Sequence, residues 1–347
     1  MPYVFFKDTV NNINPNKHCG MIGNANLCTE SFSNFKPSKI LKKEIDENKN
    51  IITKTIQAGE LHCCNLVSLN LSCIEEHELE KMTSLSVRIL DNTIDISTPP
   101  VLEADKHNNE YRILGIGSMG LADYLVKNKL LYKNGLEEIE KLYESIAYYG
   151  IKESVNLAKE RGVYPKYYGS DWSKGIIIGK NEDWFRSNNT YIPREYWIDL
   201  INDIKNFGIR NGGLFAIAPN TSTSLLMGCS ASVLPVYSKF FIDKASNGNV
   251  PICPPFLSKE TFWYYQENKN MNQNDVINAV SVIQKWTDQG ISMELCLNLN
   301  NGIKAKDIYD LYLNAWKKGC KTVYYVRSIA LRAEFPEKKE ECVSCAN

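Results

Sequence analysis

Short apolar runs that alternate with helical patterns constrain the fold of this chain most. Residues 214–218 are an apolar run bounded by Gly213 and Pro219, and residues 296–300 and 322–326 are similar runs with helical stretches between them. Runs of this length between turn residues are typical of buried strands. The alternation of strand and helix predicts an α/β fold with a largely parallel sheet or barrel.

Other parts of the chain give weaker structural signals. The clearest helix is expected around Leu142 and Ile146, which share one face, and it should end at Gly162. Residues 1–35 mix Asn, Pro and Gly with short apolar groups, which favours a loop over a periodic element. Residues 59–71 predict a buried strand followed by a helix or turn.

The charge balance bears on the possible partners. Forty basic and forty acidic residues give a formal net charge of zero, so neither nucleic acid nor a membrane surface is an expected partner. No stretch approaches the roughly 20 uninterrupted apolar residues of a membrane span. The first dozen residues lack the basic flank and apolar core of a secretion signal. A cytoplasmic location is therefore expected, and the eleven cysteines do not resemble a small secreted disulfide framework.

The end of the chain carries a pair of thiols. Residues 335–347 cannot bury much apolar area, which predicts a flexible tail. Within it, Cys342 and Cys345 have the CxxC spacing, which lets two thiols form a disulfide and exchange it with an external dithiol. A tetrahedral zinc site would need a second pair of ligands, and the adjacent Cys63 and Cys64 are poorly spaced to supply it. No metal is therefore expected.

Asn26, Cys28 and Glu30 alternate within the opening loop. Alternate residues of an extended loop point to the same side, so an amide, a thiol and a carboxylate could converge on one ligand. A carboxylate beside the thiol would raise the pKa of that thiol, which argues against an ordinary thiolate nucleophile and leaves other thiol chemistry open. A buried free cysteine beside a solvated glutamate is the simpler interpretation of these residue types.

Two further patterns are ambiguous by themselves. Cys63 and Cys64 lie in an apparent strand, where adjacent side chains point to opposite faces, so at most one can face a given site. A polar segment before the apolar LLMG marks the expected start of a helix and consists of Pro219, Asn220, Thr221, Ser222, Thr223 and Ser224. Amide and hydroxyl groups at a helix N-terminus make a good phosphate site. They also make an ordinary N-cap.

Two motifs favour a structural interpretation. Gly115, Gly117 and Gly120 fit the dinucleotide fingerprint GxGxxG, but the apolar run before them is short and no βαβ unit is expected to lead into it. Glycines that let a helix pack closely are the better interpretation. Tyr324 and Tyr325 lie in a predicted strand, where adjacent tyrosines are usually one core and one surface aromatic.

Taken in order, these motifs resemble the large subunit of class I, aerobic ribonucleotide reductase. They are NLCTE, CNLVSLN, RILGIGSMGLADYL, APNTSTSLLMGCSA, KTVYYVRS and a terminal CxxC, and the match runs from about Pro2 to the last residue. The tyrosine pair and the lack of a terminal glycyl-radical motif favour class I over the cobalamin-dependent and anaerobic branches. The resemblance implies the second half of a ten-stranded α/β barrel. Residues 1–35 would be its central finger loop, 36–334 the half-barrel and catalytic region, and 335–347 the flexible redox-active tail.

The resemblance also implies roles for the residues of the first two motifs. Cys28 would carry the thiyl radical that abstracts the 3′ hydrogen of a ribonucleoside diphosphate. Glu30 would take the proton of the 3′ hydroxyl as general base, and Asn26 would hydrogen-bond the substrate. Cys64 would be one of two thiols that supply the reducing electrons and end as a disulfide, which leaves Cys63 as a bystander.

The remaining motifs would bind the substrate and carry electrons. The hydroxyl-rich run would hold the diphosphate, although Asn220 stands where a small hydroxyl residue is expected. Tyr324 and Tyr325 would relay the radical, which a metal cofactor and a tyrosyl radical in the small subunit supply. Cys342 and Cys345 would reduce the active-site disulfide before thioredoxin or glutaredoxin reduces them. No cofactor is expected to be bound by this chain itself.

The family's first half-barrel, which holds the thiol partner of Cys64, has no counterpart in this sequence, nor do the N-terminal effector sites. We therefore expect one product of a split gene, active only with an N-terminal large-subunit polypeptide and the small subunit; truncation is the other explanation. Half a barrel would leave two strand edges exposed. An inactive fragment that only docks on the small subunit is the competing function. A free-standing thiol oxidoreductase is disfavoured, because no thioredoxin-like βαβ context surrounds the terminal cysteines.

Overall fold

Parallel strands lie side by side in the computed structural model, which describes residues 3–245, 248–299 and 302–329. Their order is β4 (Leu66–Asn70), β5 (Gly115–Met119), residues 214–218, β8 (Glu294–Asn298) and β10 (Tyr325–Ile329). Single parallel bridges, Ile116 with Phe215 and Ile217 with Ile291, attach the middle segment to its neighbours. The predicted α/β fold with parallel strands is confirmed.

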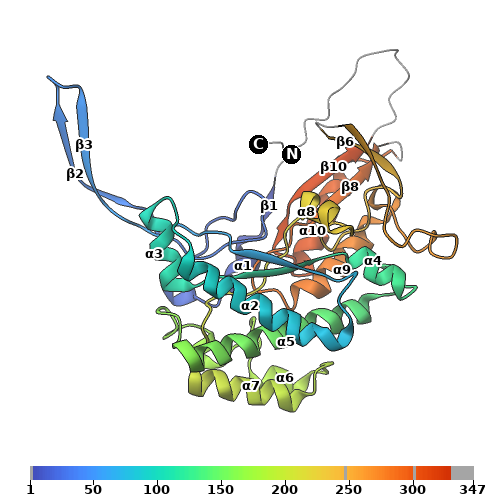
Figure 1. The fold of residues 1–347 in the computed structure, drawn as a ribbon, viewed down its shortest axis with the longest axis horizontal. Coiled ribbons are helices and arrows are strands. Elements are labelled where there is room, and N and C mark those ends of the chain that lie inside the picture. Colours follow the sequence, from blue (N-terminus) through green and yellow to red (C-terminus); the bar gives the residue numbers. More distant parts are fainter. Residues whose placement is uncertain (1–2, 246–247, 300–301, 330–347) are drawn as a thin grey trace.

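Helices connect these strands and cover them (Figure 1). They are α1 (Lys7–Ile13), α2 (Leu79–Ile96), α3 (Leu102–Tyr111), α4 (Leu121–Lys127), α5 (Leu136–Arg161), α6 (Glu182–Ser187), α7 (Arg194–Phe207), α8 (Thr221–Met227), α9 (Gln273–Gln284) and α10 (Ala305–Lys317). The predicted helix is α5, which ends at Gly162 as expected and buries Leu142 and Ile146. Among the described residues, no helix combines the length and the apolar character that crossing a membrane needs.

The middle and the margins of the sheet differ in burial. All five residues of β5 are buried, whereas in β4 only Leu69 is buried and in β10 only Val326. Within the described part of the chain, β4 pairs with β5 alone and β10 with β8 alone. The outer edges of β4 and β10 are therefore open here.

Two glycines of the GxGxxG pattern lie in the sheet, and the third precedes a helix. Gly115 and Gly117 lie inside β5, and a Cβ on Gly117 would come 2.4 Å from the carbonyl oxygen of Ala216 in the neighbouring segment. Gly120 has φ +80° and precedes α4. The expected reason, close packing of a helix, was wrong, because the close approach is between strands. A βαβ unit, β4–α2–α3–β5, also leads into this motif, contrary to expectation.

The first 35 residues are not all loop. Strand β1 (Val4–Phe5) pairs antiparallel with β9 (Thr322–Val323), and α1 follows it. The short helix α1 buries Val10 against Ile22 and Phe32 of the later loop. Packing against this small apolar cluster gives a helix that its Asn-rich sequence does not predict, and the expected absence of regular structure was wrong here.

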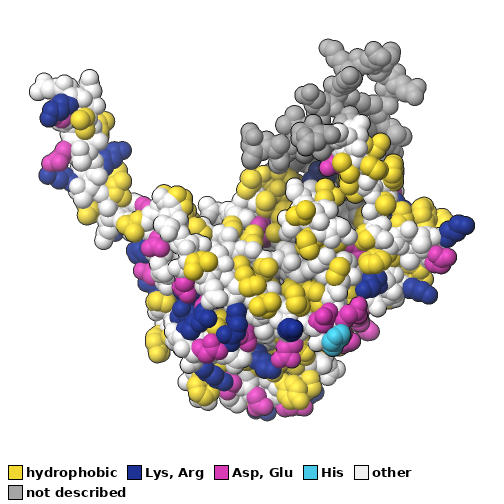
Figure 2. All heavy atoms as spheres, in the orientation of Figure 1, with side chains coloured by type: hydrophobic (Ala, Val, Ile, Leu, Met, Phe, Trp, Pro, Cys, Tyr) yellow, Lys and Arg dark blue, Asp and Glu magenta, His cyan; other side chains and the backbone are white. Residues whose placement is uncertain are grey.

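Two antiparallel hairpins lie outside the parallel sheet. The first, β2 (Lys39–Asp46) with β3 (Ile51–Gln57), projects away from the body of the molecule (Figure 1). Nearly all of its residues are exposed, and hydrophobic and charged side chains mix along it (Figure 2). The second hairpin is formed by β6 (Phe241–Ala245) and β7 (Gly248–Ile252).

Candidate active site

A tight turn at residues 26–31 brings the first predicted motif together. The backbone amide of Thr29 donates to the carbonyl oxygen of Asn26 at 3.1 Å, and the backbone amide of Asn26 donates to the carbonyl oxygen of Ser31 at 3.0 Å. Thr29 has φ +67°, an outlier for a β-branched residue that costs about 1–3 kcal/mol. The expectation of an extended loop was wrong: a strained turn, and not alternation along a strand, causes the convergence.

The end of a neighbouring strand segment holds this turn in place. The amide of Gly290 donates to the carbonyl oxygen of Glu30 at 2.7 Å, and Ser31 Oγ donates to Gln289 Oε1 at 3.2 Å. A Cβ on Gly290 would lie only 2.4 Å from the carbonyl oxygen of Thr29. The turn therefore sits against the backbone of this segment, at a distance that requires glycine.

The carboxyl group of Glu30 is buried and receives two side-chain hydrogen bonds. Asn26 Nδ2 donates to Oε1 at 2.9 Å, and Ser292 Oγ lies 3.1 Å from Oε2 and 2.6 Å from the carbonyl oxygen of Cys28. Burial raises the pKa of Glu30, and the bonds from Asn26 and Ser292 oppose that rise only in part. A carboxylate with a raised pKa is a stronger base than an exposed one, which suits it to accept a proton.

The thiol of Cys28 points toward a pair of stacked tyrosines. Its sulfur lies 3.6 Å from Tyr324 Oη, and the ring of Tyr325 stacks on that of Tyr324 with centroids 3.8 Å apart. Tyr324 is only 5% exposed. Burial, with hydrogen bonds to Tyr325 and Cys28, raises the pKa of Tyr324 well above its usual value, so this phenol stays protonated. Oxidation of Tyr324 must therefore remove a proton together with an electron.

Cys63 and Cys64 lie in the irregular segment just before β4. The expectation that they lie in a strand was wrong. Cys64 is the one beside the turn: desolvation raises the pKa of its thiol most, a hydrogen bond with Ser31 lowers it, and the Glu30 carboxylate raises it further. The side chain of Cys64 is nevertheless exposed at the surface of this site. For Cys63 the pKa is raised by desolvation alone. The turn therefore distinguishes Cys64 from its neighbour.

The hydroxyl-rich segment begins a helix, as predicted. Helix α8 starts at Thr221, with Thr221, Ser222 and Thr223 exposed and Ser224 buried. Asn220 precedes it with φ +54°, a conformation that Asn tolerates better than most residues. Its side chain accepts from Ser68 Oγ at 3.1 Å and donates to two backbone carbonyl oxygens. Asn220 therefore shapes the turn into α8.

Several supporting residues were not predicted from the sequence. Ser292 and Gln289 contact the turn directly, yet they follow α9 without a recognisable motif. His62 Nε2 lies 2.7 Å from Ser31 Oγ, and only its place beside Cys63 could have drawn attention to it. The described residues include no cluster of three or more potential ligands that could hold a metal ion. The predicted tail thiols, Cys342 and Cys345, lie outside the described residues.

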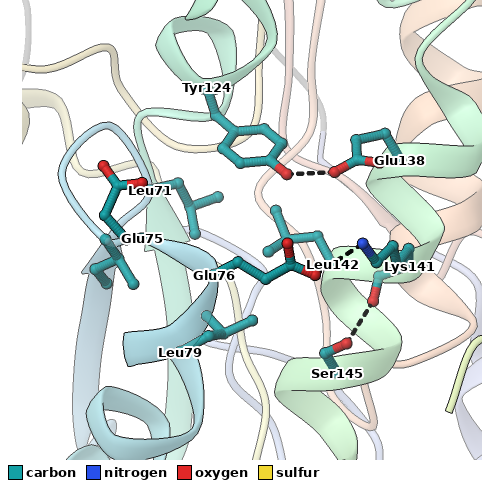
Figure 3. A pocket seen from close by; sticks show the side chains of 10 residues that line it. Leu71, Glu75, Glu76, Leu79, Tyr124, Glu138, Lys141, Leu142 and Ser145 are labelled. Atoms are coloured by element: carbon teal, nitrogen blue, oxygen red, sulfur yellow. Dashed lines mark hydrogen bonds and ion pairs between the residues drawn. The ribbon is translucent and has the colours of Figure 1, made fainter. Parts of the chain in front are cut away.

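A small hollow of about 50 Å³ is separate from these residues and lies between the segment that follows β4, which includes η2 (Glu76–Glu78), and helices α4 and α5. Its polar groups are already paired: Tyr124 Oη donates to Glu138, and Lys141 Nζ donates to Glu76 (Figure 3). None of the predicted site residues lines it. The turn at residues 26–31, and not this hollow, is therefore the candidate site.

Comparison with known proteins identifies similar sequences along the whole chain. The family model described as ribonucleotide reductase, barrel domain, matches residues 1–326. A ribonucleoside-diphosphate reductase subunit alpha of Synechocystis is 48% identical over 358 aligned residues, which cover 100% of this chain and 43% of the relative. The Helicobacter pylori (strain 26695) protein of that name is 33% identical over 100% of this chain and 49% of its own length. The chain thus spans less than half the length of these curated relatives.

Proposed function

The chain belongs to the ribonucleotide reductase barrel-domain family, and from this we propose that it is the catalytic C-terminal portion of a ribonucleoside-diphosphate reductase. In this role it converts ribonucleoside diphosphates to deoxyribonucleoside diphosphates by thiyl-radical chemistry. The observation that carries the proposal is the 3.6 Å contact between the Cys28 thiol and Tyr324 Oη. The same turn also holds a buried carboxyl group and an amide.

The first chemical step is a hydrogen transfer within this contact. A Tyr324 phenoxyl radical takes the hydrogen atom of the Cys28 thiol, which gives a phenol and a thiyl radical. The raised pKa of Tyr324 supports this step, because its proton and its electron must move together. The thiyl radical then takes the 3′ hydrogen of the ribose. The strained φ of Thr29 fits a turn that is held for function rather than for stability.

The remaining groups complete the reduction. Glu30 accepts the proton of the 3′ hydroxyl, while Asn26 holds both that carboxylate and the substrate. The 2′ hydroxyl leaves as water. At the end of the reduction Glu30 gives its proton back to the 3′ oxygen, and Cys28 returns the hydrogen atom to the 3′ carbon and becomes a thiyl radical again. Cys64 and a second thiol, supplied by an N-terminal polypeptide, together give up two electrons and two protons and become a disulfide. The position of Cys64 beside Ser31 and Glu30 supports this role, and Cys63 has no part in it.

The exposed start of α8 is where the substrate diphosphate would bind. Thr221, Ser222 and Thr223 present hydroxyl groups there, and the backbone amides of a first helical turn lack partners within the helix. Asn220 acts through its backbone turn, since its side chain is already engaged. Pro219 and Ser224 would bracket this phosphate-binding segment.

The proposed enzyme needs partners. The open edges of β4 and β10 support completion of the barrel by an N-terminal large-subunit polypeptide, the other product of a split gene, which would also carry the effector sites. A small subunit, with its metal cofactor and tyrosyl radical, supplies the oxidant to Tyr325 and Tyr324. Cys342 and Cys345 return electrons from thioredoxin or glutaredoxin to the active-site disulfide. The reaction would take place in the cytoplasm.

The test is reduction of labelled cytidine diphosphate by this chain, with and without the N-terminal polypeptide and the small subunit. Activity is expected only in the full mixture. Cys28→Ser and Cys64→Ser should abolish it, whereas Cys63→Ser, an adjacent and chemically matched change, should not. A folded chain that binds the small subunit but gives no product in any mixture would overturn the catalytic proposal and establish a docking fragment instead. Gel filtration of the two large-subunit pieces tests the split-gene arrangement separately.

A further inference from the structure

A third aromatic ring lies against the stacked tyrosines. The ring of Tyr3 is parallel to that of Tyr324, with centroids 5.7 Å apart and planes within 5°. It also contacts Tyr325, at 5.6 Å and a tilt of 34°. Tyr3 is 43% exposed, whereas Tyr324 is 5% exposed. One ring thus touches both members of the pair and is itself more exposed to solvent than Tyr324.

Backbone pairing fixes the position of Tyr3. In the antiparallel ladder between β1 and β9, Val4 is opposite Val323 and Phe5 is opposite Thr322. Continuing that register by one residue places Tyr3 opposite Tyr324. Residues directly opposite in an antiparallel pair have their side chains within contact distance. The pairing of Val4 with Val323 therefore brings Tyr3 beside Tyr324.

The two relay tyrosines need support because they are adjacent in sequence. Successive residues of a regular strand point to opposite faces, yet these rings stack at 3.8 Å. The strand is interrupted at this point: Tyr324 lies between β9 and β10, its amide donates to Met293, and Tyr325 begins the ladder with β8. The interruption turns both rings to one side, and regular strand geometry does not hold them there.

We propose that Tyr3 is a positioning residue of the tyrosine relay, whose ring packs against both tyrosines and keeps them stacked. The stacking of Tyr324 on Tyr325 is observed in the fold itself. The role of this stacking in radical transfer rests on the function proposed above. The ring of Tyr3, and not its hydroxyl group, supports the pair, because both contacts are between rings, one parallel and one tilted. Phenylalanine should therefore replace it, and a small aliphatic residue should not.

The test uses the full chain with 3-fluorotyrosine in place of Tyr325, observed by fluorine NMR. In Tyr3→Phe the resonance should stay where it is in the parent chain. In Tyr3→Ala it should move toward that of free fluorotyrosine, because the ring leaves the stack and loses the ring-current shift. Tyr168→Ala is the matched control: Tyr168 is 78% exposed and also contacts a neighbouring tyrosine ring, that of Tyr167. This control should leave the resonance unchanged.

Cytidine diphosphate reduction in the full mixture provides the second measurement. Loss of two aromatic contacts of ordinary strength should lower the stacked population, and with it the rate, about tenfold in Tyr3→Ala. Tyr3→Phe should restore the rate. An unchanged resonance in Tyr3→Ala would overturn the inference, as would a rate in Tyr3→Phe as low as in Tyr3→Ala. A shifted resonance with no activity even in the parent chain would refute the proposed function and leave the positioning role standing.

Discussion

Replacement of Gly290 by alanine is expected to dislodge the turn that carries Cys28. The added Cβ would lie 2.4 Å from the carbonyl oxygen of Thr29, 2.9 Å from Phe32 Cε1 and 3.1 Å from Glu30 Cα. The nearest and the third of these atoms belong to the backbone, so no flexible side chain can simply move aside. The turn must shift as a unit.

The cost of that shift can be worked out from two contributions. Overpacking of a close contact costs about 1–3 kcal/mol. Separation of the two backbones also lengthens the 2.7 Å bond from the Gly290 amide to Glu30, worth about 1 kcal/mol more. A total of about 3 kcal/mol corresponds to roughly a hundredfold loss of the docked turn. Since the Cys28 to Tyr324 contact depends on docking, deoxynucleotide formation should fall by a similar factor.

Hydrogen exchange measures this effect directly. The backbone amides of residue 290, Asn26 and Ser31 are hydrogen-bonded in the docked turn and should exchange faster in Gly290→Ala than in the parent chain. The exchange rates are compared at several pH values. Gly23→Ala is the matched control, because its Cβ would meet only the side chain of Phe35, at an ordinary 3.5 Å. Unchanged protection and unchanged activity in Gly290→Ala would refute the argument that close backbone contact holds the turn.

Three further predictions concern charge and capping. Ser292→Ala removes a bond that lowers the pKa of Glu30, so the rising limb of the pH–rate profile should move to higher pH; an unmoved limb would exclude Glu30 as the base. Burial lowers the pKa of His107 to about 4 in the folded chain, from 6.5 in the unfolded chain. The contribution of the neutral imidazole to the free energy of unfolding is therefore complete above pH 6.5 and is lost as the pH falls toward 4. At pH 5 this loss is about 2 kcal/mol, and urea unfolding of His107→Gln should show a flatter acid limb. Asn220→Ala removes the side-chain amide that supports the turn and leaves alanine at φ +54°, which is strained for it, so the KM for cytidine diphosphate should rise about tenfold. The rise should be smaller in Asn220→Gly, because glycine adopts this φ without strain.

Periodic patterns predicted elements that contribute to the hydrophobic core. The C-terminus of α5 at Gly162 and the apolar run at 214–218 follow from local sequence, because a helix end needs a residue that can leave the helix and a buried strand needs apolar residues on both faces. The hairpin of β2 and β3 was missed although its signals are present, with β-branched residues in β3 and Asn50 at φ +54° in the turn. Exposure of both its faces removes the alternation by which strands are usually recognised.

The candidate site was less accessible to local reasoning. Asn26, Cys28 and Glu30 were singled out as a group, but the turn that joins them depends on Gly290 and Gln289, some 260 residues away in the chain. No spacing rule connects such distant residues, because a strand end and a loop meet only when the whole sheet has formed. The order of motifs, and not any single motif, therefore placed these residues in one site.

The interruption between β9 and β10 makes chain length a sensitive variable at this point. A conservative substitution there leaves the phase of the side chains intact, whereas a single inserted or deleted residue inverts it for everything that follows. After one insertion, Val326, now 6% exposed, would turn outward, and the two tyrosine rings would part. Among related sequences, the number of residues between β9 and β10 is therefore expected to stay constant.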